Sequence, residues 1–283
     1  MRNQIRNSRD ARKIVKLGVA LAAIGVSLYP GIKPAWATPS GLITVPSTDI
    51  YREGNIHLDL DYLHFPSFNT AAGGRQSSLN VFTTGLQYGL GPDTDKPFGR
   101  TEIGFDFQVA QTGGFRRLGT TDRLSFNAKT QLYNDYEKGV RVVIGASGLG
   151  TKTTASNFGY ITGSKNFGPA GRVHLGFGRA FNDRLFGGPG VERNVVQFGY
   201  ERLLSRQLRF IAEYGTGKSG FGNAGASLVY YLNNRSNIQL AALRPNQRNG
   251  SNVFYYLGYD LNFARPTRAE AAPETSPEGE ARK

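Results

Sequence analysis

The stretch Asn252-Val-Phe-Tyr-Tyr-Leu-Gly-Tyr-Asp-Leu-Asn-Phe263 alternates two kinds of side chain along its whole length. Every second residue is apolar, in the order Val253, Tyr255, Leu257, Tyr259, Leu261 and Phe263. The residues between them change from aromatic to small or polar, in the order Phe254, Tyr256, Gly258, Asp260 and Asn262. Because successive side chains of a strand point to opposite faces, this pattern predicts a β-strand with one face toward lipid and one toward a wetter interior.

The first 37 residues have the order of a secretory signal peptide. Six basic residues precede residue 17, an apolar run of 13 residues spans 17–29, and Ala35-Trp36-Ala37 forms a small-x-small cleavage site. The run is shorter than the ~20 residues that a membrane helix needs, which makes a short membrane anchor the weaker alternative. We expect residues 1–37 to be the signal peptide, with cleavage after Ala37.

Removal of the signal peptide changes the charge of the chain. Of the 34 basic and 21 acidic residues, 27 and 20 remain, so the net charge falls from +13 to +7. An exported chain without interleaved aromatic and basic residues is not expected to bind nucleic acid. The absence of cysteine excludes a disulfide framework and thiolate chemistry. We expect no cofactor and no metal, because the three histidines do not cluster in the sequence.

The sequence offers one weak candidate for catalysis. His64 lies near Ser67, but no residue can be named that would orient the histidine as nucleophilic catalysis requires. His64 fits better as a polar residue at a membrane interface. We therefore expect no catalytic residues and no enzymatic activity.

Alternation recurs along the chain and predicts an all-β fold, a single antiparallel up-and-down transmembrane β-barrel of about 12 strands. The expected strands are 54–65, 77–90, 100–110, 121–133, 139–149, 157–167, 172–181, 192–201, 207–214, 221–232, 236–243 and 252–263. Each has about ten residues, the length that crosses a bilayer at a tilt. The mature chain has no apolar run approaching the length of a membrane-spanning helix, which excludes a helical membrane protein.

The expected connections are long at one end of the barrel and short at the other. With both termini in the periplasm, the outside loops are 66–76, 111–120, 150–156, 182–191, 215–220 and 244–250. The inside turns are 91–99, 134–138, 168–171, 202–206 and 233–235. Apart from 91–99, every turn is shorter than every loop, an asymmetry typical of outer-membrane barrels that a soluble β-sandwich has no reason to show.

Three parts of the mature chain follow from this assignment. A periplasmic N-terminal segment covers 38–53, the barrel covers 54–263, and a periplasmic tail covers 264–283. The tail holds four basic and four acidic residues and no Ile, Leu, Val or aromatic residue, which predicts disorder.

Charged side chains on the polar faces of the strands are candidates to line the lumen. The expected lumen-facing residues are His57, Asp59, Asp61, Glu102, Asp106, Arg123, Lys129, Arg141, Arg209 and Glu213. An acidic wall beside a basic wall would set a transverse field that orients polar solutes in a pore. The same groups could instead pair and fill the lumen. Both interpretations stay open, because twelve strands fall between filled eight-stranded and open sixteen-stranded barrels.

The expected outside loops are strongly basic, with Asp183 as their one acid. Their basic residues are Arg75, Arg116, Arg117, Lys152, Arg184, Lys218, Arg244 and Arg248. We predict an electropositive outer rim that concentrates anions near the mouth. Its partner would be an anionic solute or acidic polysaccharide, or else the anionic sugars and phosphates of lipopolysaccharide in the outer leaflet; both stay open.

The final strand resembles the closing strand of bacterial outer-membrane barrels, whose terminal aromatic is part of the signal read by the barrel assembly machinery. The resemblance makes Tyr259, Leu261 and Phe263 the expected assembly signal. It implies contact with the assembly machinery and with the lipid of a Gram-negative outer membrane. The tail after Phe263 departs from the many members that end at this aromatic residue.

Residues 39–54 resemble the start of the YjbH-like outer-membrane proteins linked to exopolysaccharide production. These proteins open with Gly-Leu-Ile, then Pro-Ser or Pro-Thr, then an acidic-Gly pair that leads into the first strand. The matching positions here are Gly41, Leu42, Ile43, Pro46, Ser47, Glu53 and Gly54. Gly41 and Pro46 would let the segment fold back at the periplasmic mouth. We hypothesise that it plugs or narrows the lumen.

The sequence thus predicts an outer-membrane pore or export conduit for polar solutes, with anionic solutes or polysaccharide as the favoured cargo. The alternative is a structural or assembly barrel with a filled lumen and no transport of its own.

Overall fold

The computed structural model describes residues 41–66, 68–69, 75–76, 78–92, 96–112, 116–117, 124–150, 158–181, 192–219, 221–246 and 253–263. The predicted signal peptide, most of the expected outside loops and the predicted tail lie outside these residues. Within the described ranges no helix is long and apolar enough to span a bilayer, a finding that does not bear on strands.

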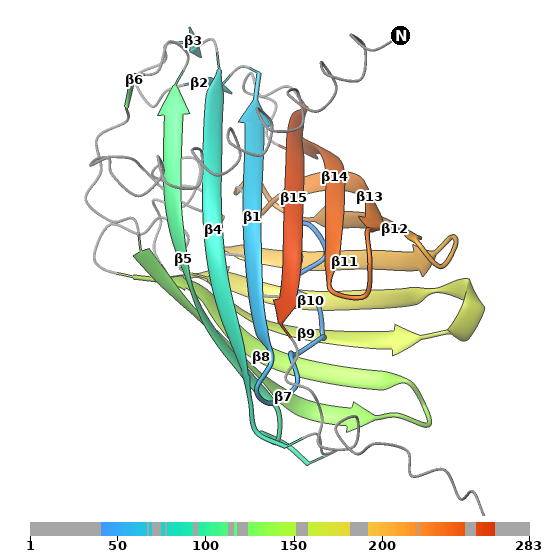
Figure 1. Ribbon diagram of the computed structural model, residues 1–283. Helices are drawn as coiled ribbons and strands as arrows, with labels where there is room; N and C mark the ends of the chain where they lie inside the picture. The colour runs from blue at the N-terminus through green and yellow to red at the C-terminus, as the bar shows by residue number, and fades with distance from the viewer. Residues whose placement is uncertain are drawn as a thin grey trace, which may run out of the picture.

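Twelve antiparallel strands close into a barrel (Figure 1). They are β1 (Ile56–Phe65), β4 (Leu79–Leu90), β5 (Thr101–Thr112), β7 (Leu124–Asp135), β8 (Val140–Leu149), β9 (Phe158–Asn166), β10 (Arg172–Ala180), β11 (Asn194–Leu203), β12 (Leu208–Gly215), β13 (Asn223–Tyr231), β14 (Ser236–Pro245) and β15 (Phe254–Phe263). Each pairs with the next along the chain, and β15 pairs with β1 from Ile56↔Phe263 to His64↔Tyr255. The ring therefore has no open edge.

Short strands and a 3-10 turn lie at the ends of the barrel. β2 (Phe68–Asn69) pairs with β3 (Arg75–Gln76), and β6 (Arg116–Arg117) pairs with the end of β5. A 3-10 turn, η2 (Gly168–Ala170), joins β9 to β10.

Each of the twelve expected strands is present, with bounds that agree within three residues. The expectation that Arg244 lies in an outside loop is wrong, because β14 runs on to Pro245. Arg244 and Pro245 continue the ladder against Ala224 and Asn223 of β13. The physical reason is that backbone pairing extends as far as the partner strand does, whatever the side chains are.

The strand β7 breaks the simple alternation. Its register against β8 shifts between Phe126 and Ala128 and again between Gln131 and Tyr133. Such irregularities place two residues of one strand opposite one of its partner, which moves the next side chain to the other face. Asn134 is accordingly buried while Tyr133 is exposed.

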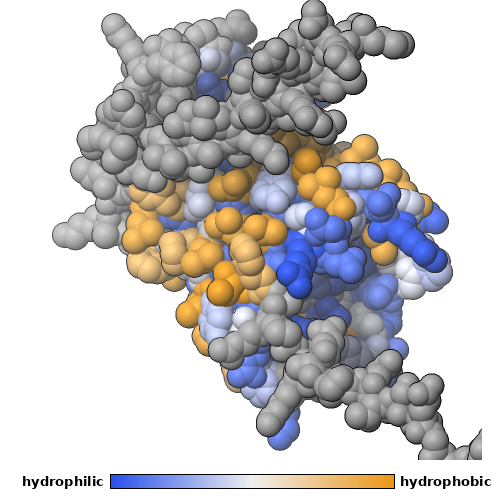
Figure 2. Space-filling model, viewed as in Figure 1, coloured by the Kyte–Doolittle hydropathy of each residue, from blue (hydrophilic) through white to orange (hydrophobic). Residues whose placement is uncertain are grey.

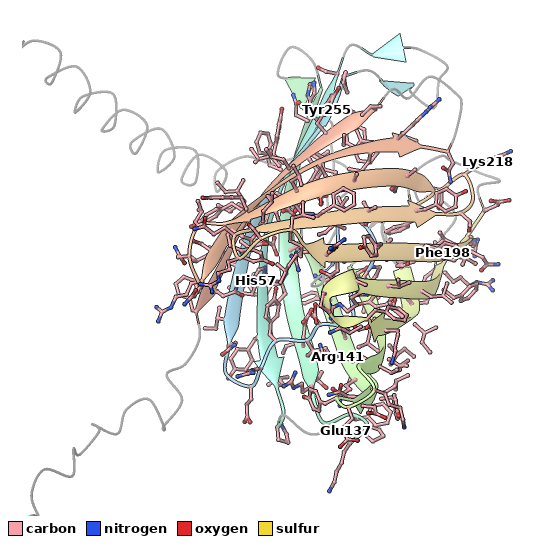
Figure 3. The ribbon with its side chains drawn as sticks, turned by 90° about the vertical axis from the view of Figure 1, so that its right-hand side faces the viewer. His57, Glu137, Arg141, Phe198, Lys218 and Tyr255 are labelled. Carbon is pink, nitrogen blue, oxygen red and sulfur yellow. The ribbon has the colours of Figure 1, made fainter. Side chains whose placement is uncertain are left out.

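The two faces of the barrel wall differ in polarity. On β1, Ile56 and Leu60 are exposed on the outside, whereas His57, Asp59 and Asp61 are buried inside. Figure 2 shows apolar side chains gathered over the outer face of β1, β4 and β5. Phe198 and Tyr255, labelled in Figure 3, lie on the outside of β11 and β15. An apolar surface of this extent needs lipid around it, since a soluble monomer rarely exposes one.

Apolar side chains also occur inside the barrel, in two clusters. One packs Phe158 against Phe221, with ring centroids 4.2 Å apart. The other holds Ile211 and Val229 together with Leu42, Ile43 and Val45, which precede the first strand. The second cluster shows that part of the chain outside the wall is packed within it.

An arginine in the middle of the outer face should destabilise the barrel. Leu175 lies near the centre of β10 with 55% of its surface exposed, and Leu175→Arg should cost about 2–4 kcal/mol in lipid. Leu204, equally exposed at 55%, lies in the turn after β11, where the same substitution should cost about 0–1 kcal/mol. Urea unfolding in liposomes measures both. Equal effects at the two positions would contradict the placement of β10 across the bilayer.

Candidate functional site

Residues 41–53 precede β1, and all of them except the exposed turn residues Arg52 and Glu53 lie inside the barrel. Their contacts reach inward-facing side chains on Lys129 of β7, Ser164 of β9, Glu213 of β12 and Gln239 of β14. A segment that touches strands around the whole ring can do so only from within it. In Figure 1 this blue segment is seen behind β15.

The tip of this segment is a tight turn. Gly41 and Pro46 form an isolated antiparallel bridge, and the Leu42 N–H donates to the Val45 carbonyl at 2.8 Å. The chain therefore reverses between these residues. The reversal turns three successive backbone N–H groups, those of residues 43–45, in one direction.

The carboxylate of Glu213 fills the concavity of this turn. The N–H groups of Ile43, Thr44 and Val45 donate to it at 3.0, 2.9 and 3.1 Å, and the Thr44 hydroxyl donates as well. Successive N–H groups in a turn form an anion-binding nest. Glu213 is only 6% exposed, so this nest supplies hydrogen bonds that the buried carboxylate would otherwise lack.

The wall is shaped to accept the tip. A Cβ placed on Gly199 of β11 would lie 2.2 Å from Leu42 Cδ1, so the side chain of Leu42 occupies space that only a glycine leaves open. Gln239 donates from Nε2 to the Leu42 carbonyl at 2.8 Å. The tip is thus held by hydrogen bonds, by apolar packing and by shape.

Asp49 connects the segment to two arginines of the wall. Arg141 of β8 donates from Nη1 to Oδ1 at 3.0 Å. Arg172 of β10 donates from Nη1 to Oδ1 at 2.7 Å and from Nη2 to Oδ2, a two-pronged contact. The position of Asp49 within the barrel would raise its pKa, but the hydrogen bond and charge of Arg172, with two further cations, hold that pKa well below its ordinary value. Asp49 is therefore ionised at neutral pH.

The ion pairs continue beyond Asp49 along the wall. Glu201 of β11 accepts from Arg172 Nε at 2.6 Å and from Arg209 Nη1 of β12 at 3.0 Å. His174 Nε2 lies 3.0 Å from the same carboxylate. Arg172 is consequently held on one side by Glu201 and on the other by Asp49.

Acidic side chains dominate one side of the inner wall, and the basic ones lie on the other side together with the buried Glu201 and Glu213. Acidic side chains gather on β15, β1 and β5, and they are the partly exposed Asp260 and the buried Asp59, Asp61, Glu102 and Asp106. The basic residues come from β7, β8, β10 and β12, and they are Lys129, Arg141, Arg172 and Arg209. Figure 3 labels His57 and Arg141, one from each part. The two parts meet where Lys129 Nζ lies 3.6 Å from Glu102 Oε1.

A cavity of about 230 Å³ remains between the segment and the acidic part of the wall. Asp59, Asp61, Asp260 and Arg209 line it from the strands. Asp49 lines it from the segment and keeps 43% of its side chain exposed. The described lumen is therefore narrowed by the segment without being completely filled.

The expected lumen residues can now be placed. His57, Asp59, Asp61, Glu102, Asp106, Lys129 and Glu213 are buried inside the barrel, and Arg141 and Arg209 are partly buried there. Arg123 lies outside the described residues. Within the described ranges no three His, Cys, Asp or Glu side chains are grouped to hold a metal ion.

The expected outer rim falls mostly outside the described residues. This holds for Lys152, Arg184 and Arg248, while only the backbone is described for Arg75, Arg116 and Arg117. Lys218 and Arg244 are exposed. The basic rim therefore stays a prediction.

Two other expectations concern the strand ends. Tyr259, Leu261 and Phe263 pair with Leu60, Leu58 and Ile56 at the closure of the ring, and their role as an assembly signal stays a prediction. His64 Nδ1 lies 2.7 Å from the Asn80 side-chain oxygen, and Ser67 lies outside the described residues.

Sequence reasoning missed Asp49, Arg172 and Glu201. Asp49 and Arg172 are 123 residues apart, and nothing local indicates that they meet. For Arg172 and Glu201 the sequence did contain a signal. Arg172 and Glu201 have the same strand parity as the inward-facing His174 and Gly199, so alternation alone places them on the inner face.

Comparisons with known proteins give a distant structural likeness. No family model matches the chain, and none of the curated proteins does. The resemblance of residues 39–54 to the YjbH-like proteins is thus unsupported. The solved KdgM porin is similar at 11% identity, with 73% of this chain and 99% of that chain covered and a TM-score of 0.47.

Two further solved structures give similar values. A KdgM porin in complex with disordered oligogalacturonate has 9% identity, covers 73% of this chain and 99% of its own, and has a TM-score of 0.45. A triple mutant of Rhodopseudomonas blastica porin has 7% identity, 74% and 99% coverage and a TM-score of 0.38. A likeness at this level says nothing about the solute of this protein.

Replacing the Glu213 carboxylate should loosen the tip. Hydrogen bonds to a charged group contribute about 1.5–3 kcal/mol, so Glu213→Gln should speed hydrogen exchange at the amides of residues 43–45 by about ten-fold or more. Mass spectrometry of the purified barrel measures this exchange. Glu137→Gln, in the exposed turn after β7, is the control and should change nothing. Unchanged protection in Glu213→Gln would contradict the nest.

Proposed function

We propose that this protein is an outer-membrane pore for polar solutes and that residues 41–53 narrow its lumen. The observation that carries the proposal is the polarity of the wall. Charged and amide side chains line much of its inner face, while the outer face is apolar. A barrel of this kind presents lipid with an apolar surface and offers water and polar solutes a path inside.

The outer membrane is the location that this wall fits. Closed barrels span membranes because every backbone N–H and C=O group is paired within the ring. An antiparallel ring with an even number of strands is the bacterial outer-membrane form. The predicted signal peptide is consistent with export to that membrane.

Anionic solutes fit the arginine side of the lumen. Arg141, Arg172 and Arg209 come from three strands of one side, and their guanidinium groups suit carboxylate or phosphate. An acidic polysaccharide carries the same carboxylates along a chain. The predicted basic rim would add to the capture of anions at the outer mouth.

One observation favours the alternative of a structural or assembly barrel with a filled lumen. Residues 41–53 make direct hydrogen bonds with charged groups of the wall, and a permanently docked segment would leave only the small cavity. Single-channel conductance of the unmodified mature chain separates the two functions, because a barrel filled by a permanently docked segment conducts no ions.

Deleting residues 38–50 should widen the path. The deletion retains residues 1–37 for export and the turn in which Asn55 N–H donates to the Arg52 carbonyl at 3.0 Å. Because the segment occupies the lumen, its loss should raise single-channel conductance several-fold in planar bilayers. Equal conductance of the deletion and the full mature chain would rule out the narrowing.

A point substitution provides a second route to the same result. Gly199→Leu places a side chain where Leu42 packs, so the tip should be expelled while the strand pairing of β11 is retained. Conductance should rise as in the deletion. Gly163→Leu on β9 is the control, because a Cβ there meets only ordinary contacts at 3.7 Å or more. A rise in Gly163→Leu as large as in Gly199→Leu would contradict a specific effect on the tip.

A further inference from the structure

We propose that Arg141 and Arg172 form a binding site for the carboxylate of an anionic solute, and that Asp49 occupies this site as a tethered substitute while the segment is docked. The inference rests on the proposed pore function and adds to it a ligand class and a means of control. The solute and Asp49 then compete for one pair of guanidinium groups.

The contact geometry has the features of a recognition site. Guanidinium groups from β8 and β10 converge on one carboxylate, and Arg172 meets it through two parallel N–H donors. This planar, two-pronged match is the reason that arginine recognises carboxylates in solutes as well as in proteins. The carboxylate of Asp49 is in this respect chemically equivalent to that of a sugar acid.

The site should keep its shape when Asp49 leaves. Glu201 accepts hydrogen bonds from Arg172 Nε at 2.6 Å and from Arg209 Nη1 at 3.0 Å. Neither contact involves the N-terminal segment. Arg172 is therefore oriented from the side of the wall. A binding group that is already oriented loses less conformational entropy when its ligand arrives.

The charges favour a replacement anion. With Asp49 docked, three guanidinium groups of Arg141, Arg172 and Arg209 face two carboxylates, those of Asp49 and Glu201. Departure of Asp49 leaves three cations and one carboxylate. Partly buried charges are costly without a partner, so the vacated position attracts another anion.

A solute can reach the site. Asp49 borders the cavity of about 230 Å³, and Arg209 lines the same cavity. The opposite side of that cavity carries Asp59, Asp61 and Asp260, which repel an anion toward the arginines. Arg141 and Arg172 do not line this cavity, so a carboxylate that enters it meets Arg209 and reaches the other two arginines as Asp49 leaves them.

The arrangement makes the docked segment an autoinhibitory contact. A solute that displaces Asp49 removes one anchor of the segment, while the nest around Glu213 and the contacts of Leu42, Ser47 and Thr48 remain. The solute and Asp49 cannot occupy the arginines at the same time. Removal of the Asp49 carboxylate therefore raises the apparent affinity for the solute, because the site is then vacant in a larger fraction of the molecules.

Binding of glucuronate to the detergent-purified mature barrel tests the proposal, with glucose as the uncharged control. Isothermal titration calorimetry at low ionic strength should show that Asp49→Asn binds glucuronate about ten-fold or more tightly than the unmodified protein. Neither protein should bind glucose. Asp49→Glu, which restores a carboxylate, should return the affinity toward that of the unmodified protein.

Two further variants keep the result specific. Asp49→Asn combined with Arg141→Gln should lose the gain, because one of the two guanidinium groups is gone. Glu137→Gln removes one negative charge from an exposed turn and should not change affinity. No gain in Asp49→Asn, or an equal gain in Glu137→Gln, would overturn the site. The measurement needs no ion flow, so it separates failure of this site from failure of the proposed pore.

Discussion

Backbone hydrogen bonding in a medium without water is the constraint on which this structure depends. Every N–H and C=O group at membrane depth must be paired by the protein itself, and a sheet meets that demand only when it closes. The pairing of β15 with β1 closes it here, over nine residue pairs from Ile56↔Phe263 to His64↔Tyr255. Closure then divides the side chains of every strand between lipid and lumen, which is why alternation pervades the sequence.

The same division creates the electrostatic problem that the N-terminal segment solves. An inner wall rich in carboxylates, with guanidinium groups along one side, leaves charges in a narrow, partly dry space, where each needs a partner. Residues 41–53 supply partners of both kinds. Their backbone N–H groups surround the Glu213 carboxylate, and the Asp49 carboxylate lies between Arg141 and Arg172. Occupation of the lumen thus follows from the chemistry of the wall.

The strands could be predicted from the sequence because their determinant is local. A period of two can be read from any ten residues, and it correctly located all twelve strands, including the terminal one that ends at Phe263. Alternation could not predict the irregularities of the strands. The register shift in β7 places Tyr133 outside and Asn134 inside the barrel, and pairing with β13 extends β14 past Arg244. The docking of Asp49 on Arg172 depends on closure of the whole ring, so no local pattern contains it.

A disulfide between the segment and the wall tests most directly whether residues 41–53 occupy the lumen. The chain has no cysteine, and the hydroxyl oxygens of Thr48 and Ser164 lie 2.6 Å apart. The account predicts that Thr48→Cys with Ser164→Cys forms a disulfide in the assembled barrel, detected by mass spectrometry after digestion. Thr48→Cys with Ser205→Cys, in the exposed turn after β11, should form none. Absence of the first disulfide, or equal yields from both pairs, would contradict it.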